Sequence, residues 1–503
     1  MNKKKFFAML EAQGLAVTFD DVRLCTGYAE VMPDDVDVSS KFSRHVPLKV
    51  PLISAPMDRV TESKMAIALA KMGGLGIIHK GLSPDDQAAE VRRVKNHLHG
   101  LIAEPVTVRR SDTVESVRLL REQKGYSFET FPVLDDSGRL VGILSGSDFE
   151  FCDGHDRRVV QVMSRELVTA PVGTSVKSAY DRMRREKKKM LPLVDRNNRL
   201  RGMYIWSDVH RIVSVSSAYY NVDHGGRLVV GAAIGVAEDA VQRLEVLVKE
   251  DVDVLVIDTA HADSKKVFDT LRLLKKDRRC SSLDIVVGNI SEPDSARRLL
   301  RAGADGIKVG QGPGSICTTR IIAGIGCPQV TAVYNCVAAI QYAVPVCADG
   351  GITNTGDVPI AIGAGASSVM MGNVFAGTDE SPGNIVYDQF GRMRKEYRGM
   401  GSIGAMQDSA AARARYGQVA TGKKQLIPEG VEGTTEYRGK VDDVVFQFVG
   451  GLRRGMGYAG AASIVEMQRK ANFRHHSAGG QAESHPHDIE ITRASPNYRG
   501  GKR

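Results

Sequence analysis

Short apolar runs recur along the chain, and each of them ends in a polar residue or a glycine, or just before one. Most are rich in valine and isoleucine without alternating polar positions, which is typical of parallel strands buried on both faces. The eight runs occupy residues 51–55, 75–79, 228–233, 254–259, 285–289, 306–310, 344–350 and 368–372. Helix-like segments lie between many of them, at residues 238–249, 265–275, 295–302 and 334–342. Eight strand–helix units predict an α/β protein with a (β/α)8 TIM barrel.

In such a barrel the active site gathers at the carboxyl ends of the strands, because the loops that follow the strands meet there. Residues far apart in the sequence can therefore converge on one site. The strand ends of this chain carry Met57, Asp58, His79, Asp258, Asn289, Gly310, Asp349, Gly350 and Asn373.

The interval between the second and third runs is abnormally long, and it contains an internal repeat. Pro132, Val133, Asp135, Arg139, Leu140, Gly142, Ser147 and Asp148 match Pro192, Leu193, Asp195, Arg199, Leu200, Gly202, Ser207 and Asp208 at a constant offset of sixty residues. Each copy predicts a strand, a turn, a second strand and a helix that Ser147 or Ser207 would cap. We expect barrel sequence at 1–99 and 214–503 and an inserted pseudo-symmetric domain at 100–213. The copies either pack only against each other or form a ligand-binding cleft.

A glycine-rich loop at residues 310–320, Gly-Gln-Gly-Pro-Gly-Ser-Ile-Cys-Thr-Thr-Arg, follows the sixth run. Glycines let the backbone approach a ligand closely, and successive N–H groups in such a turn can bind an anion, with Ser315 adding a hydroxyl. Cys317 then offers a thiolate nucleophile beside a phosphate cradle. The alternative is a loop that carries a buried structural cysteine.

Composition and charge narrow the class of protein. The seven cysteines form no CxxC pair, and the basic opening is followed too soon by Glu11 for a signal peptide, so we expect a cytoplasmic protein. No apolar run is long enough to span a bilayer, so no membrane association is expected. The net charge of +9 permits attraction to nucleic acid or to anionic metabolites, yet no nucleic-acid-binding motif is present.

Seven motifs carry a resemblance to a known family over nearly the whole chain. They lie at residues 18–22, 57–62, 73–79, 310–320, 348–352, 397–402 and 428–433. In this order they resemble the inosine-5′-monophosphate (IMP) dehydrogenase family, and the inserted repeat is similar to a pair of cystathionine-β-synthase (CBS) modules. Guanosine monophosphate (GMP) reductases share the barrel and the cysteine loop.

The resemblance implies oxidation of IMP to xanthosine monophosphate (XMP), the committed step of guanine nucleotide synthesis. Cys317 would attack C2 of the purine, and hydride would pass to NAD. The residues implied for NAD are Asp258, Thr259, Asn289, Gly310 and Gly312. Those implied for the substrate are Ser315, Asp349, Gly350, Gly351, Gly372, Asn373, Tyr397, Gly399, Met400 and Glu429.

The resemblance also implies a second stage, in which a mobile flap at about 408–433 enters the vacated dinucleotide site and the adduct is hydrolysed. Arg415, next to Tyr416, would act as general base toward water, with Thr319 and Glu429 on a parallel proton path. An arginine normally stays protonated, so this role requires an unusual, desolvated setting.

A potassium ion is implied at the cysteine loop, held by the carbonyls of Gly312, Gly314 and Cys317. Glu483, Ser484 and His485 of a neighbouring subunit would complete its site, which implies a homotetramer and allows an octamer. The CBS pair would bind adenine or guanine nucleotides.

Two other functions remain open at this point. The first is an NADPH-dependent GMP reductase, although the reductases lack the Arg-Tyr pair. The second is a nucleotide-sensing or nucleic-acid-binding scaffold, which the intact Cys317, Thr319, Asp349 and Arg415 argue against.

Overall fold

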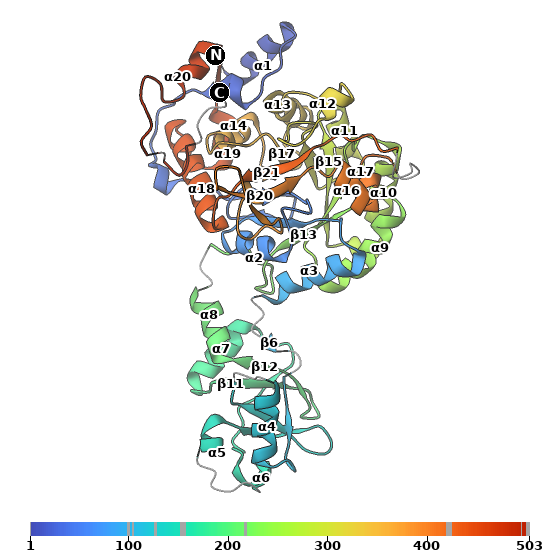
Figure 1. Cartoon of the computed structure of the whole chain (residues 1–503), viewed down its shortest axis with the longest axis vertical. Helices are drawn as coiled ribbons and strands as arrows, with labels where there is room; N and C mark the ends of the chain where they lie inside the picture. The colour runs from blue at the N-terminus through green and yellow to red at the C-terminus, as the bar shows by residue number, and fades with distance from the viewer. Residues whose placement is uncertain are drawn as a thin grey trace. The chain divides into compact units, whose positions relative to one another are not determined.

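The computed structural model describes residues 2–97, 101–102, 105–124, 128–150, 157–215, 219–418, 425–493 and 495–498. Part of the predicted flap, residues 419–424, lies outside this description. The chain forms two compact units, drawn in Figure 1. Unit 1 comprises Met1–Lys95, Tyr219–Asp223 and Leu228–Arg503, and unit 2 comprises Asn96–Ala218 and His224–Arg227.

Unit 1 is built on a closed barrel of eight parallel strands, which confirms the predicted fold. Each strand falls on one of the eight apolar runs. The strands are β4 (Leu52–Ser54), β5 (Leu75–Ile78), β13 (Val230–Ile234), β14 (Val254–Asp258), β15 (Asp284–Ile290), β16 (Gly306–Val309), β17 (Val346–Asp349) and β18 (Ser368–Met371). The pairing of β18 with β4 closes the barrel.

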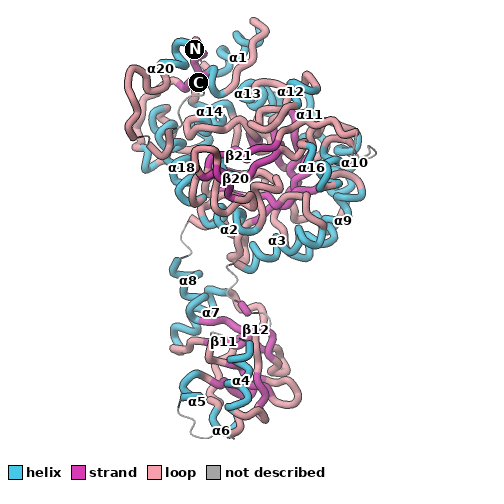
Figure 2. Tube along the Cα trace, in the orientation of Figure 1, coloured by secondary structure: helices cyan, strands magenta, loops and turns pink. Residues whose placement is uncertain are grey.

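Helices surround these strands, as Figure 2 shows. They are α2 (Ser63–Lys71), α3 (Pro84–Asn96), α9 (Glu238–Leu247), α10 (Lys265–Lys276), α11 (Pro293–Arg301), α13 (Gln329–Ile340), α14 (Asp357–Ala364) and α18 (Val441–Tyr458). Helix α18, near the carboxyl end of the chain, contacts both α14 and α2, so it packs beside the point where β18 pairs with β4. The predicted helix start at residue 334 was wrong: α13 begins five residues earlier, directly after Pro328.

The amino-terminal end of the barrel is plugged by a hairpin of β2 (Ser40–Lys41) and β3 (Pro47–Leu48). Phe42, Val46 and Leu48 of this hairpin join the inward-facing residues of the strands in one buried cluster. A Cβ at Gly306 would lie 2.9 Å from the Phe42 carbonyl oxygen, so the strand needs glycine where the plug enters. The filled lower end leaves the carboxyl ends of the strands as the open face.

Further elements decorate the barrel. Near its mouth are α12 (Thr319–Ile322), α15 (Asn373–Ala376), α16 (Ile403–Asp408), α17 (Ala410–Arg415) and a sheet of β19 (Ile385–Tyr387), β20 (Met393–Arg398) and β21 (Glu432–Glu436). The rest are α1 (Lys3–Ala12), β1 (Val22–Leu24), α19 (Ile464–Lys470), β22 (Phe473–His475), α20 (Ala478–Glu483) and the 3-10 turns Phe19–Asp21, Pro33–Asp35, Val248–Glu250 and Arg278–Cys280.

Unit 2 contains the two repeat copies. The first has β7 (Val108–Arg109), α4 (Val114–Lys124), β8 (Phe131–Leu134), β9 (Leu140–Leu144) and α5 (Gly146–Glu150). The second has β10 (Ala170–Pro171), α7 (Val176–Arg185), β11 (Met190–Val194), β12 (Leu200–Ile205) and α8 (Trp206–Val215). The unit also holds β6 (Leu101–Ile102) and α6 (Val159–Val162).

The two copies share one topology, a parallel strand pair followed by an antiparallel hairpin. The hairpins have the same register shift, between Val133 and Leu134 and between Leu193 and Val194. Arg139 and Arg199, which are sixty residues apart, pair with each other in a β-bridge. Equivalent residues can pair in this way when the copies are related by a two-fold axis, so unit 2 is pseudo-symmetric.

The expectation that Ser147 and Ser207 cap helices was wrong, because α5 and α8 begin at Gly146 and Trp206. In the first copy Ser145 precedes the helix instead, and its N–H donates to Asp148 Oδ2 at 2.6 Å. Within the described residues, no helix is both long and apolar enough to cross a membrane.

Candidate active site

A cavity opens at the carboxyl ends of the barrel strands. Most residues that the sequence analysis implicated in chemistry line it. They are Asp258, Asn289, Gly310, Gly312, Gly314, Cys317, Thr319, Asp349, Gly350, Gly372, Tyr397, Gly399, Met400, Arg415, Tyr416 and Glu429. A cavity lined by backbone and by a few convergent polar side chains is typical of a small-molecule site.

Other implicated residues do not line this cavity. Gly351 directly follows the lining residue Gly350. The Thr259 hydroxyl donates to the Gly288 carbonyl at 3.1 Å. The side-chain oxygen of Asn373 accepts a hydrogen bond from the Thr435 hydroxyl. Ser315 belongs to the cysteine loop, and its side chain forms a hydrogen bond with Tyr397. Burial raises the pKa of the Tyr397 phenol, and this hydrogen bond partly offsets the rise. Glu483, Ser484 and His485 lie at and after the end of α20, where the Ser484 hydroxyl donates to the Gly480 carbonyl at 2.8 Å.

Backbone pairing fixes the cysteine loop against the last part of the flap. Cys317 and Gly430 form a β-bridge. On either side of it the Thr318 N–H donates to the Glu429 carbonyl at 3.0 Å, and the Val431 N–H donates to the Ile316 carbonyl at 2.9 Å. The flap therefore sets the position of the thiol directly.

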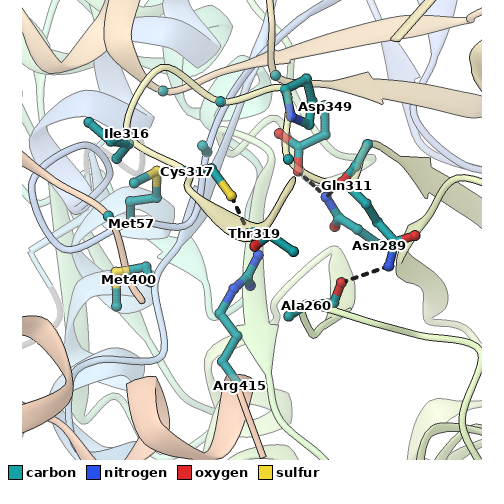
Figure 3. Close-up of a pocket in the computed structure, with 18 of the residues that line it drawn as sticks. Met57, Ala260, Asn289, Gln311, Ile316, Cys317, Thr319, Asp349, Met400 and Arg415 are labelled. Atoms are coloured by element: carbon teal, nitrogen blue, oxygen red, sulfur yellow. Dashed lines mark hydrogen bonds between the residues drawn. The ribbon is translucent and has the colours of Figure 1, made fainter. Parts of the chain in front are cut away.

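A chain of hydrogen bonds leads away from that thiol. Cys317 Sγ donates to Thr319 Oγ1 at 3.2 Å, and Thr319 Oγ1 donates to Glu429 Oε2 at 2.8 Å. Figure 3 shows the first of these bonds at the centre of the cavity. A hydroxyl can both accept and donate a proton, so Thr319 connects the thiol to a carboxylate.

Glycines allow the backbone segments to close on one another around the cavity. Gly310 has φ +153°, and a Cβ there would collide with the Asp349 carbonyl. Gly350 and Gly351, directly after β17, have φ of +89° and +82°, a conformation that glycine adopts without steric cost. These positions explain why the loops at the mouth are rich in glycine.

A buried lysine holds two carboxylates together at the floor of the cavity. Lys308 Nζ lies 3.0 Å from Asp258 Oδ1 and 2.6 Å from Asp349 Oδ2, and its side chain is 1% exposed. Asn289 Nδ2 donates to the same Asp349 oxygen at 2.9 Å and to the Gly310 carbonyl at 2.6 Å. The side chains of β14, β15, β16 and β17 thus form one connected polar network.

The flap reaches this network through Arg415, the last residue of α17. Its guanidinium forms an ion pair with Asp258 Oδ2, and its carbonyl accepts the Ala260 N–H at 3.3 Å. In Figure 3 the side chain extends from the flap helix toward Thr319. Tyr416 follows, packed against Gly401, and burial raises the pKa of its phenol. The flap is therefore docked in the cavity.

Arg398 of β20 ties the flap to the barrel. It lies 2.5 Å from Asp58, in the loop after β4, and 2.8 Å from Asp408, at the end of α16. The sequence analysis noted Asp58 as a strand-end residue without giving it a partner.

Sequence reasoning assigned no role to Lys308, Gln311 or Lys80. Gln311 is buried at the cavity wall, where its amide donates to the Ala260 carbonyl at 3.1 Å. Lys80 lies one residue beyond the predicted strand at 75–79, and its ammonium donates to the Asp258 carbonyl at 2.6 Å. The position of Lys80 just after a barrel strand could have identified it from the sequence as a residue of the active-site end.

Comparisons with known proteins agree over almost the full length. A family model described as "IMP dehydrogenase / GMP reductase domain" matches residues 16–487. An inosine-5′-monophosphate dehydrogenase of Aquifex aeolicus is 45% identical over 96% of this chain and 97% of its own length. One from Helicobacter pylori is 45% identical over 96% of this chain and 99% of its own.

A solved structure also resembles the chain. It is a cysteine-to-alanine variant of a GMP reductase from Trypanosoma brucei in complex with guanosine 5′-monophosphate. The sequences are 36% identical, the TM-score is 0.82, and the match covers 95% of this chain and 100% of the other.

Proposed function

The chain belongs to the IMP dehydrogenase and GMP reductase family, and within it we propose that this protein oxidises IMP to XMP with NAD and water. One observation carries the choice of reaction: Cys317, its Thr319–Glu429 hydrogen-bond chain and flap residue Arg415 all face one cavity. A thiol beside a docked cation and a carboxylate suits formation of a covalent adduct followed by its hydrolysis.

The first stage is attack by the Cys317 thiolate on C2 of the purine, which forms a C–S bond as hydride leaves. NAD, when bound, accepts this hydride. The Asp258 carboxylate fits the dinucleotide's ribose, because its Oδ2 faces the cavity and its present partner belongs to the flap. Lys308 pairs with that carboxylate at 3.0 Å and orients it for hydroxyl donors.

Substrate binding falls to the loops around the thiol. The described hydrogen bonds to the Asp349 carboxylate all reach Oδ2, and none of them reaches Oδ1. Oδ1 is therefore suited to accept hydrogen bonds from ribose hydroxyls. We assign the phosphate to Ser315, Tyr397 and the N–H groups of Gly351 and Gly372, with Asn373 nearby. Gly350, Gly399 and Met400 shape the space for the purine.

The second stage is hydrolysis of the adduct with the flap docked. We assign Arg415 as the general base toward the attacking water, a role that only its neutral guanidine can perform, and Thr319 passes a proton to Glu429 along the parallel path. Tyr416 excludes bulk water beside them. In the docked flap Arg415 forms an ion pair with the Asp258 carboxylate, which is the group assigned to the dinucleotide's ribose. The dinucleotide must therefore leave before the flap can dock.

A monovalent cation, K⁺, fits the cysteine loop. Gly312, Gly314 and Cys317 offer neutral backbone carbonyls, the donors that K⁺ accepts in place of its hydration shell. The Gly314 carbonyl accepts the Cys317 N–H at 3.0 Å and keeps a second lone pair. We assign the remaining ligands to Glu483, Ser484 and His485 of a neighbouring subunit in a homotetramer.

Unit 2 is, in this proposal, a pair of CBS modules that binds adenine or guanine nucleotides. The two-fold relation between the copies supports this assignment, because a pseudo-symmetric pair of modules forms two equivalent clefts. Nucleotide binding there would adjust activity or assembly into octamers. The six free cysteines among the described residues suit a reducing cytoplasm.

The runner-up is an NADPH-dependent GMP reductase, favoured by the similarity to the Trypanosoma brucei structure. That reaction releases the amino group of GMP as ammonia and needs no water-activating flap, whereas Arg415 lies in the cavity here. The two are separated by one assay. The protein is incubated with IMP, NAD and K⁺, or with GMP and NADPH, and the absorbance of the reduced nicotinamide is followed. NADH formation that disappears in Cys317→Ala supports the proposal, and NADPH loss with GMP alone overturns it.

A further inference from the structure

Lys80, in the turn after β5, is a buried cation without a counter-ion. The residue is 5% exposed. Nζ donates to the backbone carbonyl of Asp258 at 2.6 Å. Within the described part of the chain, no carboxylate oxygen lies within 4 Å of it, which sets Lys80 apart from the other cations of the site.

Charged side chains from four elements surround it. Arg243 of α9 bonds the Lys80 carbonyl at 2.9 Å and pairs with Asp239 at 2.9 Å. The charges of Lys308 of β16 and Arg415 of α17 also act on Lys80, and both side chains pair with Asp258. On its own segment, His79 Nε2 lies 3.6 Å from Glu62 Oε1.

The charges of this cluster do not balance while Lys80 is protonated. Its four cations are Lys80, Arg243, Lys308 and Arg415, and the three carboxylates that pair within it are Asp239, Asp258 and Asp349. Glu62 lies outside this set, beside His79. The carboxylates all pair with the other three cations. The excess positive charge exists only when Arg415 has docked, so loss of one proton from Lys80 restores neutrality in that state.

We propose that Lys80 is a positioning residue for the flap: its side chain fixes the backbone of Asp258, and its ammonium releases a proton to solvent when Arg415 docks on Asp258. This inference rests on the proposed function, because it deepens the exchange of dinucleotide and flap at Asp258. The reverse step, undocking, returns a proton to Lys80.

The electrostatics of the docked state agree with this. Burial first, and then the charge of the nearby Arg415, lower the pKa of Lys80 to about 7; Arg243 and Lys308 add to this effect, and Asp239 opposes it. Removing Arg415 from the cluster removes that repulsion, so the pKa of Lys80 is higher when the flap is out. Protonation of Lys80 therefore weakens the docking of Arg415, and docking of Arg415 weakens the protonation of Lys80 by the same free energy.

The sign of the pH dependence follows. Below the docked-state pKa, Lys80 is charged in both states, and docking suffers the full repulsion. As the pH rises above about 7, the docked state loses its proton first, so docking becomes more favourable. Dinucleotide binding, which displaces the flap, is accordingly favoured by lower pH.

Proton uptake on dinucleotide binding tests the proposal without turnover. ADP-ribose, which has both riboses and the pyrophosphate but cannot accept hydride, is titrated calorimetrically into the full-length protein saturated with XMP and K⁺ at pH 7.5. The titration is repeated in HEPES and in Tris, whose ionisation enthalpies differ. The wild-type protein should take up a fraction of one proton per ADP-ribose.

Lys80→Gln and Lys80→Arg are the matched variants, since both keep a donor toward the Asp258 carbonyl. Both should lose the proton uptake, and they should shift the ADP-ribose Kd in opposite directions: several-fold weaker for the neutral Lys80→Gln, whose flap docks better, and several-fold tighter for the permanently charged Lys80→Arg. A merely structural role would weaken or preserve binding in both alike.

Arg415→Ala keeps Lys80 and removes the docking cation, so it gives a reading even if the Lys80 variants fail to fold. Its proton uptake should fall below half that of the wild type. Unchanged uptake in Arg415→Ala or in the Lys80 variants overturns the inference while the proposed function stands. Absence of any ADP-ribose binding to the wild type overturns the proposed dinucleotide site and the inference with it.

Discussion

Arg415 of the flap forms an ion pair with Asp258 at the end of β14, inside the same cavity as Cys317. In the proposed reaction, Asp258 also holds the dinucleotide. One carboxylate therefore serves two partners that cannot be present together, and this exclusion orders the two stages. Hydride transfer needs the flap out, and hydrolysis needs it in.

Asp258→Asn should weaken NAD binding. The amide keeps the shape of the side chain but loses the charge that accepts ribose hydroxyls, and a hydrogen bond to a charged group contributes about 1.5–3 kcal/mol. The KM for NAD should rise roughly tenfold to a hundredfold on that basis. Asp269→Asn, on the exposed surface of α10, is the control and should leave this KM unchanged. An unaltered KM in Asp258→Asn would remove this residue from the dinucleotide site.

Lys308→Met should destabilise the barrel unit. It leaves Asp258 and Asp349 facing each other without their shared cation, and breaking a buried pair by removing one partner costs about 3–5 kcal/mol. Chemical denaturation monitored by circular dichroism measures the change. The control is Lys265→Met, because Lys265 is exposed on α10 and pairs, among the described residues, with exposed Asp269, so its loss should leave the midpoint almost unchanged. Equal midpoints for the two variants would contradict this account.

Alkylation should distinguish the cysteines by pH. Burial raises the pKa of Cys280 and Cys327 to about 11 and of Cys347 to about 12, and it also raises that of Cys336. These four thiols are protonated at pH 8, so iodoacetamide should label them only as the pH rises toward these values.

Cys317 lines the cavity and is partly exposed, so it should be labelled at pH 8 and protected by IMP. Cys25, also partly exposed but outside the cavity, is the internal control that IMP should not protect. Peptide mass spectrometry measures both. Equal labelling of Cys317 with and without IMP would place the nucleotide elsewhere.

The barrel could be predicted because its strands are buried on both faces and therefore read as uninterrupted apolar runs. The glycine-rich loop around Cys317 was also visible, since chain reversal and close approach restrict those positions to small residues. The starts of α13, α5 and α8 were not predicted correctly, because the residues that directly precede them, Pro328, Ser145 and Ile205, are not the ones that the repeat and the apolar pattern mark.

The charge network was missed for a different reason. Lys308 lies inside an apolar run, and the pairing of β14, β15, β16 and β17 brings it to Asp258 and Asp349, which are 50 and 41 residues away in the chain. Lys80 and Asp258 are 178 residues apart, and their contact depends on the inserted unit leaving β5 and β13 paired. Such long-range pairing has no signature in local sequence.

The most direct test of the central claim is rapid mixing of Arg415→Ala with IMP, NAD and K⁺. The account predicts a burst of NADH close to one per active site at nearly the wild-type rate, because Cys317 and the dinucleotide site are intact. Steady turnover should then be about 10²–10⁴-fold slower, as loss of a general base typically causes, with the purine trapped on Cys317. Steady turnover at the wild-type rate, or absence of the burst, would contradict the assignment of hydrolysis to the docked flap.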